Sequence, residues 1–310
     1  MAKGKNGRGK DTFRRVALEW LSTKEGKVKE SSLSQYKTAL LERILPKIGE
    51  NSIEYVTRKE YLEALKESFT NDGYSSVTVN NYLTLIRAVN LYYRGGIEGV
   101  YSSEKRSKVT VVSSTDVKKI ISVAKDDVSF EEPRKLGILI ILYTGLSVSE
   151  LCALRWEDVD LVNRVLTVTR AVCRYRNPNP IDGEAKTIIE ISDLTNQRRI
   201  PINKELAKRM SKYAKFAKED FYVLSNSTSI CEPRTMQYYM RNSFFKDFRY
   251  KYTHSEIRDT FIVTALRRGV NLYVLSDITG LRPDYLFDKY REYISFSADL
   301  ALVEMNKVIY

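Results

Sequence analysis

Few side chains in this sequence are of the kinds that carry out acid–base, nucleophilic or metal chemistry at neutral pH. The chain holds a single histidine, His254, and three widely spaced cysteines, Cys152, Cys173 and Cys231. One histidine excludes metal sites built on two histidines, and any Ser-His-Asp or Cys-His mechanism would have to use His254. The odd number of cysteines argues against a disulfide framework and against a zinc cluster. A reducing, cytoplasmic environment fits this cysteine usage best.

Basic side chains are the more abundant chemical feature. The chain has 51 lysines and arginines against 39 acidic residues, which gives a net charge of +12. An excess of this size is typical of proteins that bind nucleic acid or an anionic membrane surface. The longest apolar run, residues 137–143, is far shorter than the roughly 18 residues of a membrane span. We therefore expect a polyanionic partner and no membrane-spanning segment.

The first ten residues are basic and contain no acidic side chain. We predict an N-terminal arm over residues 1–10 that contacts nucleic-acid phosphates. The alternative is a solvated tail that keeps the protein soluble. The basic residues of the arm are Lys3, Lys5, Arg8 and Lys10.

The reactive and basic side chains must be positioned by secondary structure. Four amphipathic helices, each with apolar residues on one face, are predicted before residue 97. The second helix is expected to end at Pro46, because proline cannot donate the hydrogen bond that continues a helix. The predicted helices are residues 11–22 with Asp11 as N-cap, residues 31–45, a helix that begins with a Thr57–Glu60 capping-box pattern, and residues 75–94. We predict a small helical bundle over residues 11–97.

Residues 98–113 lack helical periodicity and are predicted to form an interdomain linker. Their positive charge would suit a segment that lies along a nucleic-acid backbone, although a merely solvated linker is equally compatible. The basic residues concerned are Lys105, Arg106 and Lys108.

Residues 114–310 are predicted to form a second, mainly helical domain that contains a small antiparallel sheet. A helix over residues 133–143 is apolar nearly all round and is expected to be buried. Alternating apolar residues predict strands at residues 165–168, 187–191 and 198–202. About five helices follow, and the last, over residues 296–310, carries an apolar stripe.

Three segments of this second domain resemble the signatures of the tyrosine recombinase, or phage integrase, family. TGLSVSELCALRWEDVDL, at 144–161, is similar to the motif T-G-x-R-x-x-E-L-x-x-L-x-W-x-D-I-D. QRRIPI, at 197–202, resembles a hairpin segment of the family. HSEIRDTFIVTALRRGVNLYVLSDITGL, at 254–281, resembles H-x-x-R-H-T-F followed by L-G-H. Tyr290 lies ten residues after Gly280, where the family places its nucleophile.

The resemblance spans nearly the whole chain and implies a two-domain fold, in which an N-terminal helical core-binding domain precedes a catalytic-type domain. It also implies a chemistry. A tyrosine attacks a DNA phosphate, two arginines hold the phosphate oxygens, a hairpin lysine protonates the leaving oxygen, and histidines support the phosphate. The resemblance implies that no metal or other cofactor is used.

Two of the six positions that this chemistry requires are matched, by Arg258 and Tyr290. The first arginine is replaced by Ser147, whose uncharged hydroxyl cannot substitute for a bidentate guanidinium. The four replaced positions are Ser147, Asp193, Ser255 and Leu281.

Side chains of the required types lie near some replaced positions but are displaced. Lys186 is the nearest hairpin lysine, yet it belongs to the earlier strand. His254 precedes the expected histidine position by one residue, and one residue on a helix turns a side chain by about 100°. The two matched residues also have structural interpretations. Arg258 would pair with Asp259 or Glu150, and Tyr290 would be a buried aromatic residue.

Loss of a single group that stabilises transition-state charge typically costs factors of about 10² to 10³ in rate. We therefore predict a sequence-specific double-stranded DNA-binding protein that has lost recombinase activity. The simplest role is that of a cytoplasmic, nucleoid-associated transcriptional repressor of a prophage or another mobile element. Further candidate DNA contacts in the second domain are Arg174, Arg176, Arg198, Arg199, Arg234, Arg241 and Arg258.

Two other functions remain open at this point. The chain would be an active recombinase with an atypical active site if Tyr290, Arg258, His254 and Lys186 act together. It would be an accessory subunit if it pairs with an active recombinase. The resemblance implies that self-association would use the C-terminal helix at residues 296–310.

Overall fold

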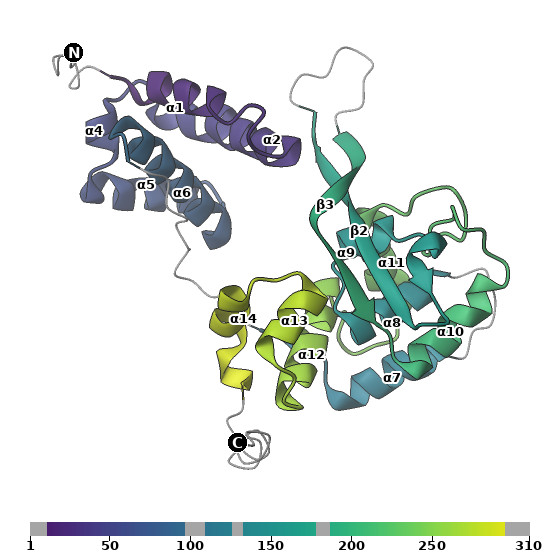
Figure 1. The fold of residues 1–310 in the computed structure, drawn as a ribbon. Coiled ribbons are helices and arrows are strands. Elements are labelled where there is room, and N and C mark those ends of the chain that lie inside the picture. Colours follow the sequence, from purple (N-terminus) through teal and green to yellow (C-terminus); the bar gives the residue numbers. More distant parts are fainter. Residues whose placement is uncertain (1–10, 97–108, 126–132, 178–186, 295–310) are drawn as a thin grey trace, which may run out of the picture. The chain divides into compact units, whose positions relative to one another are not determined.

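The computed structural model describes residues 11–96, 109–125, 133–177 and 187–294 (Figure 1). The chain divides into two compact units. The first comprises residues 1–106 with 174–189, and the second comprises residues 107–173 with 190–310. Several predictions lie outside the described residues. They concern Lys3, Lys5, Arg8, Lys10, Lys105, Arg106, Lys108, Lys186 and the helix at residues 296–310.

The helices of the first unit pack around an apolar core. They are α1 (Phe13–Ser22), α2 (Glu30–Ala39), α3 (Leu45–Ile48), α4 (Ile53–Val56), α5 (Lys59–Asn71) and α6 (Ser76–Tyr93). Phe13, Phe69 and Ile86 come from α1, α5 and α6, and all three are completely buried. The apolar faces predicted from the spacing of these residues are therefore the faces that pack inward.

The second predicted helix does not end at Pro46. α2 continues through a π-helical turn, η2 (Leu40–Ile44), into α3, which holds Pro46 in its first turn. The N–H of Leu45 donates to the carbonyl of Leu40, five residues back. This wider turn shifts the hydrogen-bond ladder immediately before the residue that lacks an N–H, so the helix passes the proline without breaking.

Two predicted helix starts are also corrected. Thr12, rather than Asp11, caps α1, because its hydroxyl accepts a hydrogen bond from the N–H of Arg15. Asp11 instead forms an ion pair with the Arg15 side chain. The Thr57–Glu60 capping box is absent from the described residues. α5 begins at Lys59 without a side-chain cap, and the Thr57 hydroxyl donates to a carbonyl of the preceding turn.

The second unit is built around one buried helix. Its elements begin with α7 (Ser114–Lys125), α8 (Pro133–Thr144), α9 (Val148–Ala153) and η3 (Trp156–Asp158) and continue after the sheet with α10 (Lys204–Ala214), α11 (Pro233–Tyr239), η4 (Met240–Phe244), α12 (His254–Arg267), α13 (Leu272–Thr279), α14 (Pro283–Tyr290) and η5 (Arg291–Tyr293). α8 lies in the core, as its apolar sequence predicts, and α12 packs against it.

The sheet has three antiparallel strands in the order β1 (Val159–Asp160), β2 (Val165–Arg176) and β3 (Thr187–Pro201). In the first pair, Val159 lies opposite Leu166. The two strands predicted at residues 187–191 and 198–202 are one continuous strand, β3. Most of the intervening residues are polar and exposed, so a sequence pattern does not reveal their pairing with β2. The prediction of a mainly helical fold with a small antiparallel sheet is confirmed.

Helices α12, α13 and α14 lie side by side at the C-terminal end of the described chain (Figure 1). Their shared core contains Ile262, Leu275, Leu286 and Tyr290, each nearly or fully buried. This packing fixes the two residues that match the family motifs, since Arg258 lies on α12 and Tyr290 ends α14.

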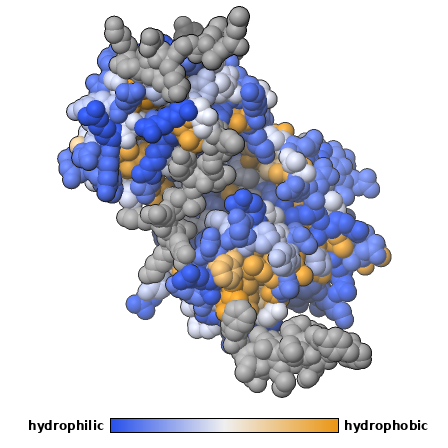
Figure 2. Space-filling view, turned by 60° about the vertical axis from the view of Figure 1, so that its left-hand side comes forward, coloured by the Kyte–Doolittle hydropathy of each residue, from blue (hydrophilic) through white to orange (hydrophobic). Residues whose placement is uncertain are grey.

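Hydrophilic side chains cover most of the face seen in Figure 2, with apolar patches between them. Val274 and Phe287 are among the exposed apolar side chains of the second unit. No helix in the described part of the chain is long and apolar enough to cross a membrane.

Candidate functional site

A tight turn places Ser147 at the start of α9. α8 ends at Thr144, and Gly145 follows with a φ of +67°, where a Cβ would lie 2.5 Å from the ring of Phe261 on α12. Only glycine fits this turn without strain. Ser147 then caps α9 in a capping box with Glu150. Its hydroxyl accepts from the Glu150 N–H at 3.3 Å, and its own N–H donates to Glu150 Oε2 at 2.9 Å. The serine at the first arginine position is therefore engaged as a helix cap.

Glu150 also joins α9 to the sheet. Its Oε1 accepts a 2.7 Å hydrogen bond from Nη1 of Arg198 on β3. The Arg198 and Glu150 side chains are only 9% and 12% exposed. Burial opposes ionisation of Glu150, but the hydrogen bond and charge of Arg198, together with the Ser147 cap, hold its pKa below the usual range. The pair is thus a buried ion pair in which both groups are charged.

Arg198 and Arg258 are held by neighbouring carbonyls at the end of α13. Arg198 Nε donates to the carbonyl of Ile278 at 2.9 Å, and Arg258 Nη2 donates to that of Thr279 at 2.7 Å. Gly280 ends the helix with a φ of +69°, and a Cβ at this position would lie 3.0 Å from Arg198 Nη1. The missing side chain of Gly280 therefore gives Arg198 room beside the helix terminus. The negative end of the helix dipole favours cations there.

Each of these two guanidinium groups keeps a buried N–H without an acceptor. Arg198 Nη2 and Arg258 Nε find no hydrogen-bond partner among the described residues. Burial, together with the charge of Arg198, lowers the pKa of Arg258, while Glu150 opposes this shift. The guanidinium of arginine does not lose its proton in proteins, so this shift leaves Arg258 charged.

Tyr290 is 1% exposed at the end of α14. Its hydroxyl donates a 2.6 Å hydrogen bond to Asp259 Oδ1, and the same oxygen lies 3.0 Å from Lys289 Nζ. Burial and the Asp259 carboxylate raise the pKa of Tyr290 well above its ordinary value. The phenol is therefore held in its protonated form.

His254 is the first residue of α12, and it is partly buried. Burial and the charge of Arg258 lower its pKa, against the opposing effect of Asp259. The imidazole is therefore neutral at pH 7 and lies within electrostatic range of Arg258, despite its one-residue offset from the motif. The Ser255 hydroxyl lies 3.3 Å from His254 Nε2 on the exposed side of the helix.

The other predicted contacts do not join this cluster. Arg174, Arg176 and Arg199 lie on the β2–β3 hairpin, and all three are exposed. Arg176 forms an ion pair with Glu42 of the same unit. Arg234 on α11 and Arg241 in η4 are exposed as well. Asp193 is exposed on β3, and Leu281 follows α13 with its backbone N–H bonded to the Thr279 hydroxyl.

The contacts made by two residues of the site were not predicted from the sequence. Asp259 binds the Tyr290 hydroxyl, and Lys289 pairs with the same carboxylate. Asp259 could have been singled out from the sequence, because it occupies the place of the second histidine in the motif H-x-x-R-H-T-F. Lys289 carries no such signal. No group of acidic, histidine or cysteine side chains in the described ranges is arranged to hold a metal ion.

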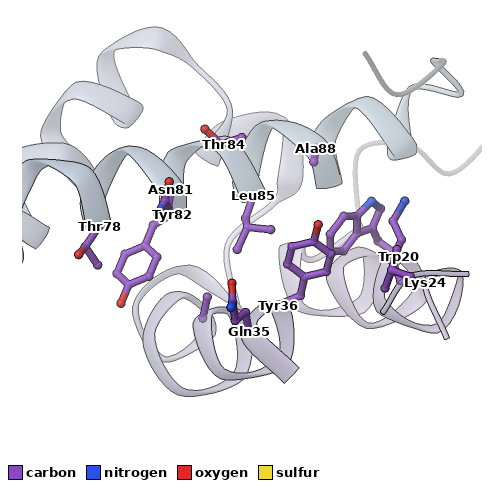
Figure 3. Close-up of a pocket in the computed structure, with 12 residues that line it drawn as sticks. Trp20, Lys24, Gln35, Tyr36, Thr78, Asn81, Tyr82, Thr84, Leu85 and Ala88 are labelled. Carbon is purple, nitrogen blue, oxygen red and sulfur yellow. The ribbon is translucent and has the colours of Figure 1, made fainter. Parts of the chain in front are cut away.

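A separate pocket of about 540 Å³ lies in the first unit, between α1, α2 and α6 (Figure 3). Trp20 and Tyr36, whose ring centroids are 5.4 Å apart, lie across from Leu85 and Ala88 of α6. Lys24 lies over the Trp20 ring at 5.0 Å. None of the residues that the family motifs identify lines this pocket.

Comparison with known families gives two matches that together cover most of the chain. Residues 110–292 match the model described as phage integrase family. Residues 12–68 match the model of the phage integrase N-terminal SAM-like domain.

Two relatives illustrate the range of named functions. IntQ of Escherichia coli (strain K12), a protein that is named as defective, is 29% identical in an alignment of 189 residues that covers 53% of this chain and 45% of that protein. This match thus spans less than half of the relative's length. A tyrosine recombinase of Thermosipho africanus (strain TCF52B) is 21% identical over 263 residues, or 81% of this chain and 84% of that one.

Two solved structures of similar fold are of integrases bound to DNA. The Tn1549 transposon integrase in complex with a circular intermediate DNA has a TM-score of 0.70 at 20% identity, with 96% of this chain and 99% of that chain covered. A lambda integrase dimer bound to a COC′ core site has a TM-score of 0.59 at 13% identity, with 93% and 97% covered. At these identities the likeness shows a shared fold.

Proposed function

The chain belongs to the phage integrase family, and on this premise we propose that it binds double-stranded DNA sequence-specifically without cutting it. The net charge of +12 supports a polyanionic partner, and the structural neighbours named above are bound to DNA. Phosphate contacts from lysine and arginine supply most of the non-specific affinity for a duplex. In this proposal the helical domain at residues 11–97 and the second domain at 114–310 both contact the duplex, and residues 98–113 link them.

The observation that carries the absence of cleavage is the hydrogen bond from Tyr290 to Asp259. A tyrosine nucleophile is activated by a lowered pKa or by a nearby base. Here burial and the adjacent carboxylate raise the pKa of the Tyr290 phenol. The Tyr290 hydroxyl is also engaged by Asp259 Oδ1 at 2.6 Å, and Tyr290 is only 1% exposed. The raised pKa and the burial of Tyr290 both support the proposal that it does not attack a phosphate.

The replacement of the first arginine supports the same proposal. The Ser147 hydroxyl is part of the α9 cap and carries no charge toward a phosphate. Removal of one donor that stabilises transition-state charge costs about 3–4 kcal/mol. The exposed Asp193 at the expected place of the hairpin lysine adds a second loss.

The biological role we propose for this DNA binding is that of a transcriptional repressor encoded by a prophage or another mobile element. A protein of this family that keeps the DNA-binding fold and lacks strand cleavage can still occupy an operator. Its binding would compete with transcription, and self-association through residues 296–310 would increase its occupancy of paired sites.

The experiment begins with the full chain and fragmented genomic DNA of its source organism. Fragments retained by the protein at physiological salt are sequenced, and a common motif is expected. Duplexes that carry the motif are then nicked at successive positions, incubated with the protein and run on a denaturing gel. We expect retarded duplex on a native gel and no covalent adduct. An adduct that disappears in Tyr290→Phe would overturn the proposal.

An active recombinase with an atypical site is the second candidate function. It is favoured by the position of Arg198, which brings a second guanidinium to the end of α13 beside that of Arg258. Tyr290 and Arg258 are themselves present at the expected motif positions. The covalent adduct described above is its predicted result, so one gel separates the two candidates.

A further inference from the structure

Arg198, whose side chain is 9% exposed, and the half-buried Arg258 form one cationic cluster at the end of α13. Their side chains bind the carbonyls of consecutive residues, Ile278 and Thr279. The charge of Arg198 also lowers the pKa of Arg258, as expected for two cations in close proximity. The guanidinium groups come from β3 and α12, which are far apart in the sequence. The fold therefore brings together two like charges, which requires compensation.

The described residues supply too little negative charge to balance the two guanidinium groups. Glu150 is the one carboxylate that pairs with Arg198, and it is also the acid whose charge acts on Arg258. Tyr290 and Tyr285 also raise the pKa of Arg258. Two cations thus share one anion, and the neighbouring His254 is neutral at pH 7 because its pKa is lowered. Among the residues that the structure describes, the cluster therefore retains one uncompensated positive charge.

A second arginine pair in the same unit shows the balanced alternative. Arg155 and Arg170 also hold a buried Nε without a partner among the described residues. They face two carboxylates, however. Arg155 pairs with Glu157 at 3.3 Å, and Arg170 pairs with Glu157 at 2.9 Å and Asp158 at 2.8 Å. That cluster is neutral. The excess charge at Arg198 and Arg258 is therefore a property of this site and not of buried arginines in general.

The unpaired N–H groups of Arg198 and Arg258 fit an anion with several acceptor oxygens. A buried charged donor without an acceptor is costly, and a guanidinium fork matches the oxygens of a phosphate. Arg258, His254 and Tyr285 are all partly or fully exposed, so an anion can approach the cluster from the surface. The missing guanidinium of position 147 would belong to the same locality, since Ser147 and Arg198 bind the two oxygens of one carboxylate, Glu150.

We propose that Arg198 supplies from β3 the guanidinium that position 147 lacks, and that Arg198 and Arg258 together hold one DNA backbone phosphate without cleaving it. This inference rests on the proposed DNA binding. Glu150 is the positioning residue, because it orients Arg198 from the helix that Ser147 caps. The phosphate provides the second anion that the cluster lacks.

The test uses the selected duplex with a methylphosphonate, which removes one phosphate charge, placed at each backbone position in turn. For the wild-type protein, one position is expected to weaken binding by about tenfold, because charge-assisted contacts to one phosphate are lost. In Arg198→Gln the overall affinity falls by a similar factor, and the same methylphosphonate has little further effect. This loss of sensitivity at a single position would not follow from a purely structural role.

Arg199→Gln is the matched control, since it removes the same charge from the adjacent, exposed residue of β3. It is expected to keep the full methylphosphonate effect at the Arg198 position, whatever its own affinity. Arg198→Lys provides the test if Arg198→Gln does not fold, because lysine keeps the charge beside Glu150 but lacks the planar fork of a guanidinium. It is expected to lose most of the effect.

Two outcomes overturn the inference in different ways. If wild type binds DNA and a folded Arg198 variant keeps the wild-type methylphosphonate profile, Arg198 holds no phosphate, while the proposed DNA binding stands. If wild-type protein retains no duplex at physiological salt, the proposed function itself fails and this inference fails with it.

Discussion

The hydroxyl of Tyr290 donates a 2.6 Å hydrogen bond to Asp259, and both side chains are buried. The phenol at the nucleophile position of the family is therefore paired with a carboxylate that accepts its hydrogen bond. A catalytic tyrosine needs a partner that removes the proton. In this pair the carboxylate is close enough to oppose formation of the phenolate by direct charge repulsion.

Asp259→Asn should lower the pKa of Tyr290 toward its ordinary value. The substitution removes the carboxylate charge and keeps a side chain of the same shape, while burial continues to raise the pKa. A ¹³C-tyrosine NMR titration, with Tyr290→Phe to assign the resonance, measures the change. A Tyr290 pKa that is the same in Asp259→Asn and wild type would show that burial alone sets it.

The raised pKa of Tyr290 predicts a loss of stability at alkaline pH. The folded state keeps the phenol proton after the unfolded chain has lost it, near pH 10. The stabilisation is therefore complete below about pH 10 and declines above it, by about 1.4 kcal/mol per pH unit. Urea unfolding between pH 9 and 11 should show this slope in wild type and a shallower one in Tyr290→Phe. Equal slopes would contradict the linkage.

Glu150→Gln should destabilise the second unit strongly. The substitution leaves Arg198, which is 9% exposed, without its anion, and a broken buried ion pair typically costs about 3–5 kcal/mol. The lowered pKa of Glu150 adds a pH dependence. Its stabilisation is present above the unfolded pKa of about 4.5 and is lost as the pH falls below it, so the variant should differ least from wild type in acid.

The matched control for this change is Glu50→Gln, in which the carboxylate pairs with Arg14 and is 77% exposed. An exposed pair is worth less than about 1 kcal/mol. Thermal unfolding of both variants at pH 7 gives the comparison. Similar losses in the two variants would mean that the Arg198–Glu150 pair contributes no more than a surface contact.

Gly280→Ala should cost more stability than Gly73→Ala. Both glycines have a positive φ, +69° and +86°, so both substitutions bear the conformational cost of about 1 kcal/mol. At Gly73 a Cβ meets nothing within 4 Å, whereas at Gly280 it lies 3.0 Å from Arg198. The difference in unfolding free energy between the two variants isolates the crowding of Arg198. An equal cost would show that Arg198 moves aside freely.

Periodicity and motif spacing could predict the elements of this fold better than its connections. The buried face of α1 and the all-round burial of α8 follow from apolar spacing. The helix passes Pro46 because of the π-helical turn at Leu40–Ile44, and no feature of the amino-acid composition predicts that turn. Most residues in the middle of β3 are polar and exposed, and the pairing of this segment depends on β2 rather than on its own sequence pattern.

The site was predictable residue by residue but not as an arrangement. Arg258 and Tyr290 are found by their place in the motifs, and Ser147 by its departure from one. The pair between Arg198 and Glu150 joins residues 48 positions apart in the sequence, and only the packing of β3 against α9 and α13 brings them together. Asp259 likewise becomes a partner of Tyr290 through the contact of α12 with α14.

The two hydrogen-bonded neighbours of Glu150 also bear on how this chain can change over generations. An arginine introduced at position 147 would remove the hydroxyl that caps α9 and would add a third guanidinium beside a carboxylate already engaged by Ser147 and Arg198. Such a variant would therefore lose stability. The local geometry thus opposes a serine-to-arginine change at position 147 unless Arg198 changes as well.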